Sequence, residues 1–270
     1  MADEEVLHGG VANAGAVVRV GDHVLRPSNP HSESIHRYLT ALRRRGFAGA
    51  SEPVTIDSDG RERLRFIPGE VATPPYPSCA RSDAALGSIA RLLLRLHDAS
   101  IGLALGATTW SNEMADPAGG EVMCHNDVCL ENVVFANGEA VALLDFDFAA
   151  PGRREFDVAA FARMCVPIDD DINAARLGWD SNDRPTRLRL VCDEYGLGRA
   201  GRNLVLECLS ESIARGGEFV QRRVEAGEAP FIEMWESMGG QERLLAQREN
   251  GTSMSVAFLS PLHDAGAQLR

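Results

Sequence analysis

The apolar and polar positions of the first 70 residues are typical of strands joined by tight turns. AVVRV (residues 16–20) and HVLR (residues 23–26) flank Gly21-Asp22, a dipeptide that favours a hairpin turn. A second strand pair is predicted within residues 51–71, around the turn from Asp57 to Gly60. Between the two hairpins one helix is expected, and we count five strands and this helix in the first 70 residues.

The segment between the two predicted hairpins has the apolar spacing of a helix, which its neighbours lack. Ile35, Tyr38, Leu39 and Leu42 recur on one face of a helix that Gly46 ends. Ser28, Asn29 and Ser32 are candidates for its N-terminal cap, and Pro30 suits a first turn.

The rest of the chain changes character after a proline-rich linker, VATPPYPSC (residues 71–79). Ser82 is expected to cap an amphipathic helix that runs to about His97, and short strands follow at VVFA and VALLDF around Asn137-Gly138. From about Phe156 onward the pattern is mainly helical. We therefore expect an α+β fold with two lobes: residues 1–70, small and β-rich with one helix, and residues 71–270, larger and mainly helical.

Composition narrows the chemistry. The chain has no lysine, so its 27 basic residues are all arginine. This excludes a Schiff-base lysine and a Walker-type phosphate loop. Of the net charge of −12, the first 100 residues contribute nothing, with 12 acids and 12 arginines, so the whole deficit lies after them. Such a field serves solubility or attracts cations, and it disfavours a nucleic-acid partner.

The sequence gives weaker indications of the protein's cellular location and of metal binding. No apolar run approaches the roughly 20 residues that span a bilayer. The start, MADEEVLHGG, is acidic and lacks a signal-peptide core, so we predict a cytoplasmic protein with no membrane partner. The six cysteines have no framework spacing and are expected to be reduced. Cys124, His125 and Cys129 are not followed by a second metal-ligand pair, which argues against zinc.

One stretch concentrates polar groups among apolar strands, CHNDVCLENVVFANGEAVALLDFDF (residues 124–148). His125, Asp127 and Asn132 form H-x-D-x-x-x-x-N, and Asp145 ends the next apolar strand. In phosphoryl transfer, one aspartate accepts the proton of the attacking hydroxyl, while an asparagine and a second aspartate bind Mg²⁺. The ordered set favours such a site over four unrelated turn residues.

These motifs resemble the aminoglycoside phosphotransferase family and its choline-kinase-like relatives, which have a protein-kinase-like fold. HNDVCLENVVF resembles the family's catalytic loop, LLDF its metal-binding strand, and PGRREFD its later G-x-x-x-x-D. GGVANAGAVVRVGDHVLRP resembles the glycine loop and first strands, and FIPGEV the hinge, so the resemblance covers nearly the whole chain.

The resemblance implies roles at the matching positions. Asp127 would be the catalytic base, His125 would brace its loop, and Asn132 and Asp145 would bind Mg²⁺, with Asp157 organising the lobe. The nucleotide would meet Arg26 at its phosphates. The carbonyl of Arg65 and the amide of Ile67 would meet the adenine. Further phosphate contacts are expected from the glycine loop, at Gly9, Gly10 and Asn13.

Two positions depart from the family pattern. Asn126 stands where the family usually has glycine, and asparagine tolerates a left-handed backbone better than most residues. Arg26 stands where a lysine usually binds phosphate, with different geometry. The usual helix partner of that lysine is a glutamate. Here Glu33 lies very near the helix start, and His36 could face Arg26 instead.

The leading hypothesis is an O-phosphotransferase that uses ATP (or GTP) and Mg²⁺ to modify a cationic, antibiotic-like small molecule, as a monomer or weak dimer. A kinase of a cellular amino alcohol or sugar and a nucleotide-binding pseudoenzyme remain alternatives. Asp147 could contact metal or be solvated. The candidates for the acceptor pocket, each weaker than a surface role, are Asp169, Asp170, Asp171, Trp179, Trp235, Glu207, Glu211 and Glu233.

Overall fold

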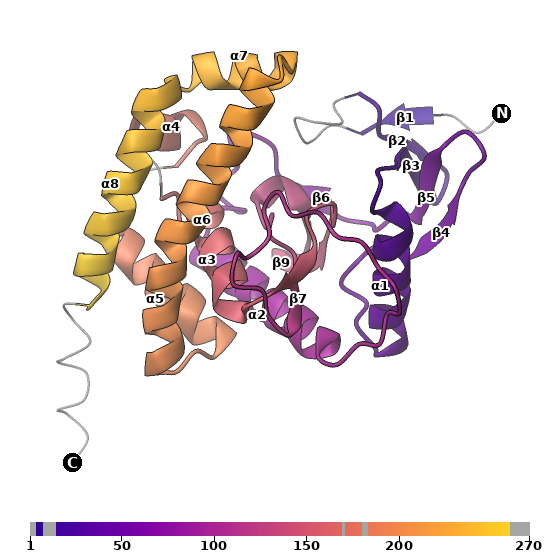
Figure 1. Cartoon of the computed structure of the whole chain (residues 1–270), viewed down its shortest axis with the longest axis horizontal. Helices are drawn as coiled ribbons and strands as arrows, with labels where there is room; N and C mark the ends of the chain where they lie inside the picture. Colours follow the sequence, from indigo (N-terminus) through magenta and orange to yellow (C-terminus); the bar gives the residue numbers. More distant parts are fainter. Residues whose placement is uncertain (1–3, 8–14, 169–170, 180–182, 260–270) are drawn as a thin grey trace.

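The computed structural model describes residues 4–7, 15–168, 171–179 and 183–259. Its N-terminal part is an antiparallel sheet of five strands in the order β1-β2-β3-β5-β4, with one helix beside it (Figure 1). The elements are β1 (Glu4–Val6), β2 (Val18–Val20), β3 (His23–Pro27), α1 (Ser32–Arg44), β4 (Pro53–Ile56) and β5 (Arg61–Arg65).

Both predicted hairpins are present. Gly21 has φ +62° between β2 and β3, and Gly60 has φ +82° between β4 and β5, a region that glycine enters without steric cost. β3 and β5 then pair directly, so that Arg26 lies opposite Glu62. Neighbours in this sheet are therefore residues far apart in the sequence.

The side chains of the predicted cap residues, Ser28, Asn29 and Ser32, do not cap α1. The backbone amide of His31 donates to the Asn29 side chain, and the amide of Asn29 donates to Ser32 Oγ. Ile35, Tyr38, Leu39 and Leu42 are buried, as the helical spacing predicts.

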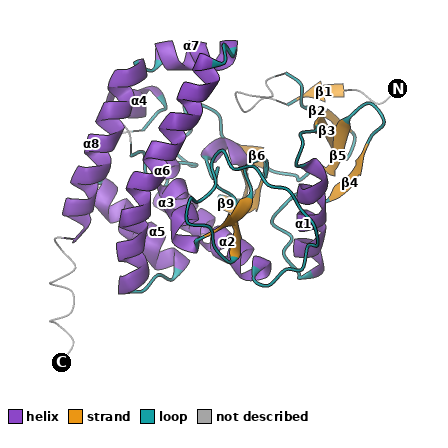
Figure 2. Ribbon diagram, in the orientation of Figure 1, coloured by secondary structure: helices purple, strands orange, loops and turns teal. Residues whose placement is uncertain are grey.

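The C-terminal part consists mainly of helices around two small antiparallel sheets, β6-β8-β9 and β10-β7 (Figure 2). Together with the sheet-rich N-terminal part this confirms the predicted α+β, kinase-like architecture. The elements are β6 (Glu70–Val71), α2 (Asp83–Ser100), β7 (Val122–Cys124), a short 3₁₀ helix η1 (Leu130–Asn132), β8 (Val133–Ala136), β9 (Glu139–Leu143), β10 (Ala150–Gly152), α3 (Arg154–Cys165), α4 (Asp171–Arg176), α5 (Arg184–Tyr195), α6 (Arg199–Glu225), α7 (Ala229–Ser237) and α8 (Gly240–Leu259).

Helix α2 forms the centre of the core. Ser82 Oγ accepts from the amide of Ala85, the N-terminal cap that the sequence predicts. The helix packs against α5 on one side and β9 on another, while α3 packs along α6. Leu93 and Leu96 of α2 are 0% exposed. The helix therefore lies in a close-packed apolar core, and this core supports the loops attached to it.

The segment between α2 and β7 crosses from the helical part to α1. The amide of Thr109 donates to Ser34 Oγ at 2.9 Å, and Arg37 donates to the carbonyl of Ala107 at 2.8 Å. The rings of Tyr38 and Trp110 meet edge to face. This crossing holds α1 against the helical part, together with a bond from the amide of Leu143 to the carbonyl of Gly49.

No helix in the described part of the chain is long and apolar enough to cross a membrane.

Thiol chemistry provides a test of this packing. Cys79 is exposed, and the other five cysteines are buried free thiols whose pKa burial raises. We expect a disulfide reagent at pH 8 to modify one thiol rapidly in the native protein and six in denaturant. Cys79→Ser should remove the rapid reaction. A native protein with two or more rapidly reacting thiols would contradict the packing.

Candidate functional site

The motif HNDVCLEN forms the loop between β7 and β8, with η1 at its end. Both strands are buried, so the loop begins and ends on fixed points. Asn132 closes it, because its carbonyl accepts from the amide of Leu144 at 2.8 Å. This bond also joins the loop to the segment that carries Asp145.

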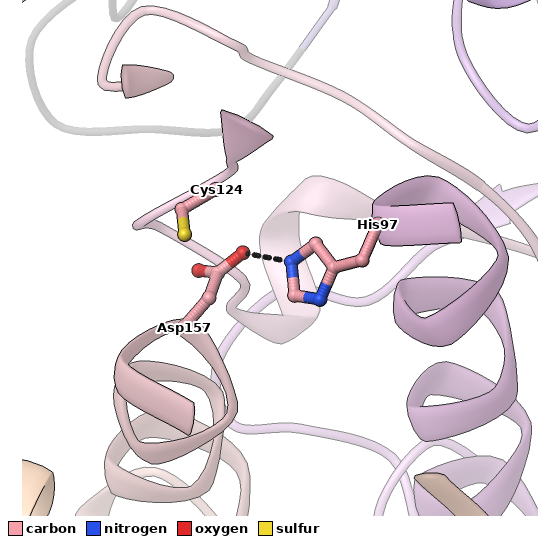
Figure 3. Close-up of side chains that lie close together, drawn as sticks. All are labelled: His97, Cys124 and Asp157. Carbon is pink, nitrogen blue, oxygen red and sulfur yellow. Dashed lines mark hydrogen bonds and ion pairs between the residues drawn. The ribbon is translucent and has the colours of Figure 1, made fainter. Parts of the chain in front are cut away.

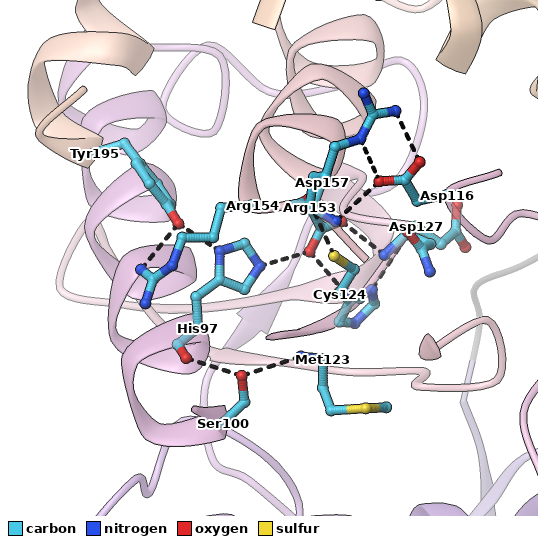
Figure 4. Close-up of polar contacts among 12 residues, drawn as sticks. His97, Ser100, Asp116, Met123, Cys124, Asp127, Arg153, Arg154, Asp157 and Tyr195 are labelled. Atoms are coloured by element: carbon cyan, nitrogen blue, oxygen red, sulfur yellow. Dashed lines mark hydrogen bonds and ion pairs between the residues drawn. The ribbon is translucent and has the colours of Figure 1, made fainter. Parts of the chain in front are cut away.

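Asp157, in the first turn of α3, holds the start of this loop. Its carboxylate is 0% exposed and accepts from the amides of His125 and Asn126, both at 2.7 Å, and from His97 Nε2 at 2.9 Å (Figure 4). Burial alone would raise the pKa of Asp157, but the bond from His97 and its neighbours hold the pKa below its usual value.

The side chains of His97, Cys124 and Asp157 lie close enough together to hold a metal ion, with ligand atoms within 4.8 Å of one another (Figure 3). Their atoms are already used in hydrogen bonds. His97 lies between Asp157 and the hydroxyl of Tyr195, and the Cys124 thiol donates to the carbonyl of Arg153 at 3.3 Å. Burial raises the pKa of the Cys124 thiol, which opposes the thiolate that a metal needs. We read the cluster as a structural network.

His125 connects the two polar segments. Its Nε2 donates to the carbonyl of Leu144 at 2.9 Å, and its ring lies 4.5 Å from that of Phe146. Its Nδ1 accepts from the amide of Asp127. Burial lowers the pKa of His125, so the ring is neutral with its proton on Nε2.

Asn126 adopts the left-handed conformation, with φ +66°. The cost of this conformation is offset by its side chain, whose Nδ2 donates to the carbonyl of Phe148 at 2.8 Å. Asparagine therefore fits the position where the family pattern has glycine. Its side chain also adds a hydrogen bond between the loop and residues 145–148.

Asp127 and Asn132 point at each other. Asn132 Nδ2 donates to the carboxylate and to the backbone carbonyl of Asp127, both at 3.0 Å. Because these bonds use the side-chain nitrogen of Asn132, its side-chain oxygen is left for another ligand. Burial and the charge of Asp145 raise the pKa of Asp127 to about 7, although Arg163 opposes the shift.

A single arginine links the N-terminal sheet to the aspartates after β9. Arg26 NH1 donates to Asp145 at 2.9 Å, and NH2 donates to Asp147. Asp145 has φ +59°, an uncommon conformation that directs its carboxylate out of the strand path. Burial and the charge of Asp145 raise the pKa of Asp147 to about 6, against the lowering effect of Arg26.

Arg26 pairs with neither of the two α1 residues, Glu33 and His36, that the sequence left open as its partner. Glu33 is 80% exposed at its side chain and contacts Arg37 within its own helix. Instead Arg26 Nε donates to Glu62 of β5 at 2.9 Å, and His36 lies 3.8 Å from the same carboxylate. Glu62 was missed because the sequence did not show that β3 and β5 are neighbours.

The remaining nucleotide candidates are only partly described. Gly9, Gly10 and Asn13 lie outside the described residues. Arg65 ends β5, and Ile67 lies in the link from the N-terminal sheet to β6. Their contacts with the nucleotide stay a prediction.

The acceptor candidates do not form one cluster. Trp179 is 4% exposed and packs against Tyr76, as a core residue does. Glu211 contacts Arg153, and Glu207 and Glu233 are exposed on α6 and α7. Trp235 lies beside Gly240, and Asp171 pairs with Arg184. Asp169 and Asp170 lie outside the described residues.

Comparison with known proteins places this geometry in a family. Residues 103–191 match the model of the phosphotransferase enzyme family. The trifolitoxin immunity protein of Rhizobium leguminosarum bv. trifolii is 33% identical over 209 residues, covering 75% of this chain and 77% of the relative.

Two solved structures share the fold. A choline/ethanolamine kinase family protein from Mesorhizobium loti has a TM-score of 0.60 and 12% identity, covering 98% of this chain and 90% of its own. The streptomycin–ATP–APH(2″)-IIa ternary complex has a TM-score of 0.52 and 15% identity, covering 86% and 90%.

Asp157→Asn tests how strongly the loop depends on its buried carboxylate. The substitution leaves an amide group facing two backbone donors, so we expect the free energy of unfolding in urea to fall by about 3–5 kcal/mol. The matched control is Asp98→Asn, whose carboxylate is 59% exposed beside Arg154 and should cost less than about 1 kcal/mol. Equal losses in the two variants would refute the role given to Asp157.

Proposed function

The chain belongs to the phosphotransferase enzyme family, and on this premise we propose that it transfers the γ-phosphoryl group of ATP or GTP to a hydroxyl of a cationic, antibiotic-like small molecule. The observation that carries the proposal is the half-buried Asp127, held by Asn132 in the loop that Asp157 fixes. It is a rigidly placed carboxylate beside further oxygen ligands, the arrangement that phosphoryl transfer requires.

In this proposal Asp127 is the base. The acceptor oxygen forms a bond to phosphorus as the bond to the nucleoside diphosphate oxygen breaks, and the hydroxyl proton passes to the Asp127 carboxylate. The pKa of about 7 for Asp127 is well matched to holding that proton near neutral pH. His125 contributes by fixing the loop rather than by proton transfer, because its Nε2 proton is bonded to Leu144.

The residues fit a magnesium ion. Asn132 offers an amide oxygen and Asp145 a carboxylate, and hard oxygen ligands are what Mg²⁺ prefers. Asp147 offers a second carboxylate in the same place, since Arg26 contacts both aspartates. The bound ion would neutralise phosphate charge during transfer. Asn132 and Asp145 would hold it.

For the nucleotide we propose Arg26 at the phosphates, with the Arg65 carbonyl and the Ile67 amide at the base. Gly10 and Asn13 would cover the phosphates from the glycine loop. The link from β5 to β6 joins the two parts of the molecule, which supports placing the base there.

The acceptor class rests on charge. The acids of α6–α8 that are exposed to solvent belong to the part of the chain after residue 100, which carries the whole net charge of −12, and they are Glu207, Glu211, Glu218, Glu225, Glu233, Glu236, Glu242 and Glu249. Such a field concentrates cations and repels anionic sugars. The relative's name, an immunity protein against trifolitoxin, supports a toxin or antibiotic over a metabolite. Amino alcohols share the positive charge and form the second candidate class.

The first test is nucleotide turnover with Mg²⁺, coupled to a panel of aminoglycosides, peptide antibiotics, macrolides and amino alcohols. Asp127→Asn should lower kcat/KM about 10²–10⁴-fold, the range of a lost general base. Asp193→Asn, an exposed acid on α5, is the control and should retain wild-type turnover. Nucleotide binding without turnover on any acceptor would favour the pseudoenzyme. Turnover on a neutral acceptor, insensitive to salt, would refute the cationic class.

The pH profile tests the base separately. Asp127 must be ionised to accept a proton, so kcat/KM should fall as the pH is lowered through about 7, approaching tenfold per unit below the apparent pKa. Circular dichroism at each pH would exclude unfolding as the cause. A rate that stays constant down to pH 5 in a folded protein would contradict the assignment.

A further inference from the structure

Arg26 is the most heavily engaged cation of the site. Its side chain is 9% exposed, and three carboxylates from two distant segments surround it. Burial alone would lower the pKa of Arg26, but Asp145, Asp147 and Glu62 raise it overall, so the guanidinium stays charged. Each of its three kinds of nitrogen has its own partner: Nε bonds Glu62, NH1 bonds Asp145 and NH2 bonds Asp147.

These three partners differ in how firmly they are held. Glu62 is 1% exposed and lies opposite Arg26 in the β3–β5 ladder. Its other oxygen accepts from Ser32 Oγ, and His36 lies 3.8 Å away. Burial would raise the pKa of Glu62, but its contacts with His36, Arg26 and Ser32 lower it to about 2. Asp145 and Asp147 are more open, with 35% and 22% of their side chains exposed.

We propose that Glu62 is the positioning residue of the nucleotide clamp: it anchors Arg26 through Nε, so that NH1 and NH2 can exchange the carboxylates of Asp145 and Asp147 for nucleotide phosphates. Asp145 and Asp147 would hold a divalent cation, which would supply the positive charge that they take from Arg26, and NH1 and NH2 would then be available to the phosphates. The inference rests on the proposed function, because it needs a nucleotide.

The geometry of arginine makes this exchange possible. The guanidinium is planar and presents separate donors along two edges, so one edge stays on Glu62 while the other binds an anion with two parallel bonds. Lysine carries its three donors on a single nitrogen, so it cannot keep an acid on one edge while it presents two parallel donors to an anion on the other.

The contact of Glu62 with Arg26 also accounts for the lack of a buried acid on the side of α1 that faces Arg26. Glu33 points into solvent, while Ser32 and His36 of the same helix turn toward Glu62. The helix therefore supports the clamp indirectly, through the acid of β5, and Arg26 keeps its position from its own sheet.

The test measures binding of a non-hydrolysable ATP analogue with Mg²⁺ by calorimetry, in Glu62→Gln, Arg26→Gln and the double variant. Glu62→Gln should bind the analogue about tenfold more weakly. If Glu62 acts through Arg26, adding Glu62→Gln to Arg26→Gln should cost no further affinity. Asp57→Asn is the matched control, because it breaks the neighbouring ion pair with Arg63 in the same hairpin and should leave affinity unchanged.

Two further measurements test the proposal independently, in case Glu62→Gln fails to fold. Ser32→Ala removes one support of Glu62 and should weaken analogue binding about two- to fivefold, but only while Arg26 is present. Mn²⁺ binding without nucleotide, followed by electron paramagnetic resonance, should become at least fivefold tighter in Arg26→Gln, because the guanidinium no longer competes for Asp145 and Asp147.

The outcomes separate this inference from the proposed function. Wild-type protein that binds no nucleotide would overturn both. Wild-type binding that Glu62→Gln leaves intact would overturn the anchor alone, as would equal losses from Glu62→Gln with and without Arg26. Unchanged or weaker Mn²⁺ binding in Arg26→Gln would overturn the exchange.

Discussion

The site depends on a carboxylate that does not touch the reacting groups. Asp157 is fully buried in α3, where an unpaired charge would cost several kcal/mol, and three donors converge on it from His97, His125 and Asn126. Two of these donors are backbone amides of a loop that has few ladder bonds of its own. The loop is therefore held by a side chain, which lets Asn126 keep its left-handed backbone and directs Asp127 toward Asn132. Loss of this carboxylate would strand two buried amides, so loop geometry and stability are coupled.

A second constraint acts across the two parts of the molecule. Arg26 joins the N-terminal sheet to Asp145 and Asp147, and the backbone amide of Leu143 donates a hydrogen bond to the carbonyl of Gly49. Burial and then the negative charge of Asp145 raise the pKa of Asp127 to about 7 and the pKa of Asp147 to about 6. Burying like charges destabilises a folded protein, and such arrangements persist where function needs them. Arg26 compensates part of this charge, because it bonds both Asp145 and Asp147.

The sequence predicted those parts of the fold in which local pattern and final structure agree. Apolar spacing located α1 and α2, the turns at Gly21 and Gly60 located the hairpins, and the cap at Ser82 was correct. The acid that faces Arg26 was not found, because which strands pair is decided by the packing of the whole sheet. Spacing along α1 suggested Glu33 or His36, yet tertiary pairing of β3 with β5 placed Glu62 there. The acceptor pocket was equally out of reach, since its candidates are scattered: Trp179 belongs to the core, and Glu207 and Glu233 face solvent on different helices.

The absence of lysine ties these findings together. A lysine at position 26 would place its three donors on one nitrogen, so it could not hold three carboxylates at separate nitrogens as a planar guanidinium does. With arginine, Glu62 can remain on one nitrogen while Asp145 and Asp147 occupy the others, and the interaction reaches from β5 to the segment after β9. Replacement of the usual lysine is therefore not an isolated substitution. It occurs together with a buried acid in the neighbouring strand, and Ser32 and His36 lie beside that acid. Arg26, Glu62 and the start of α1 form one linked unit, which is why the helix can dispense with an acid of its own.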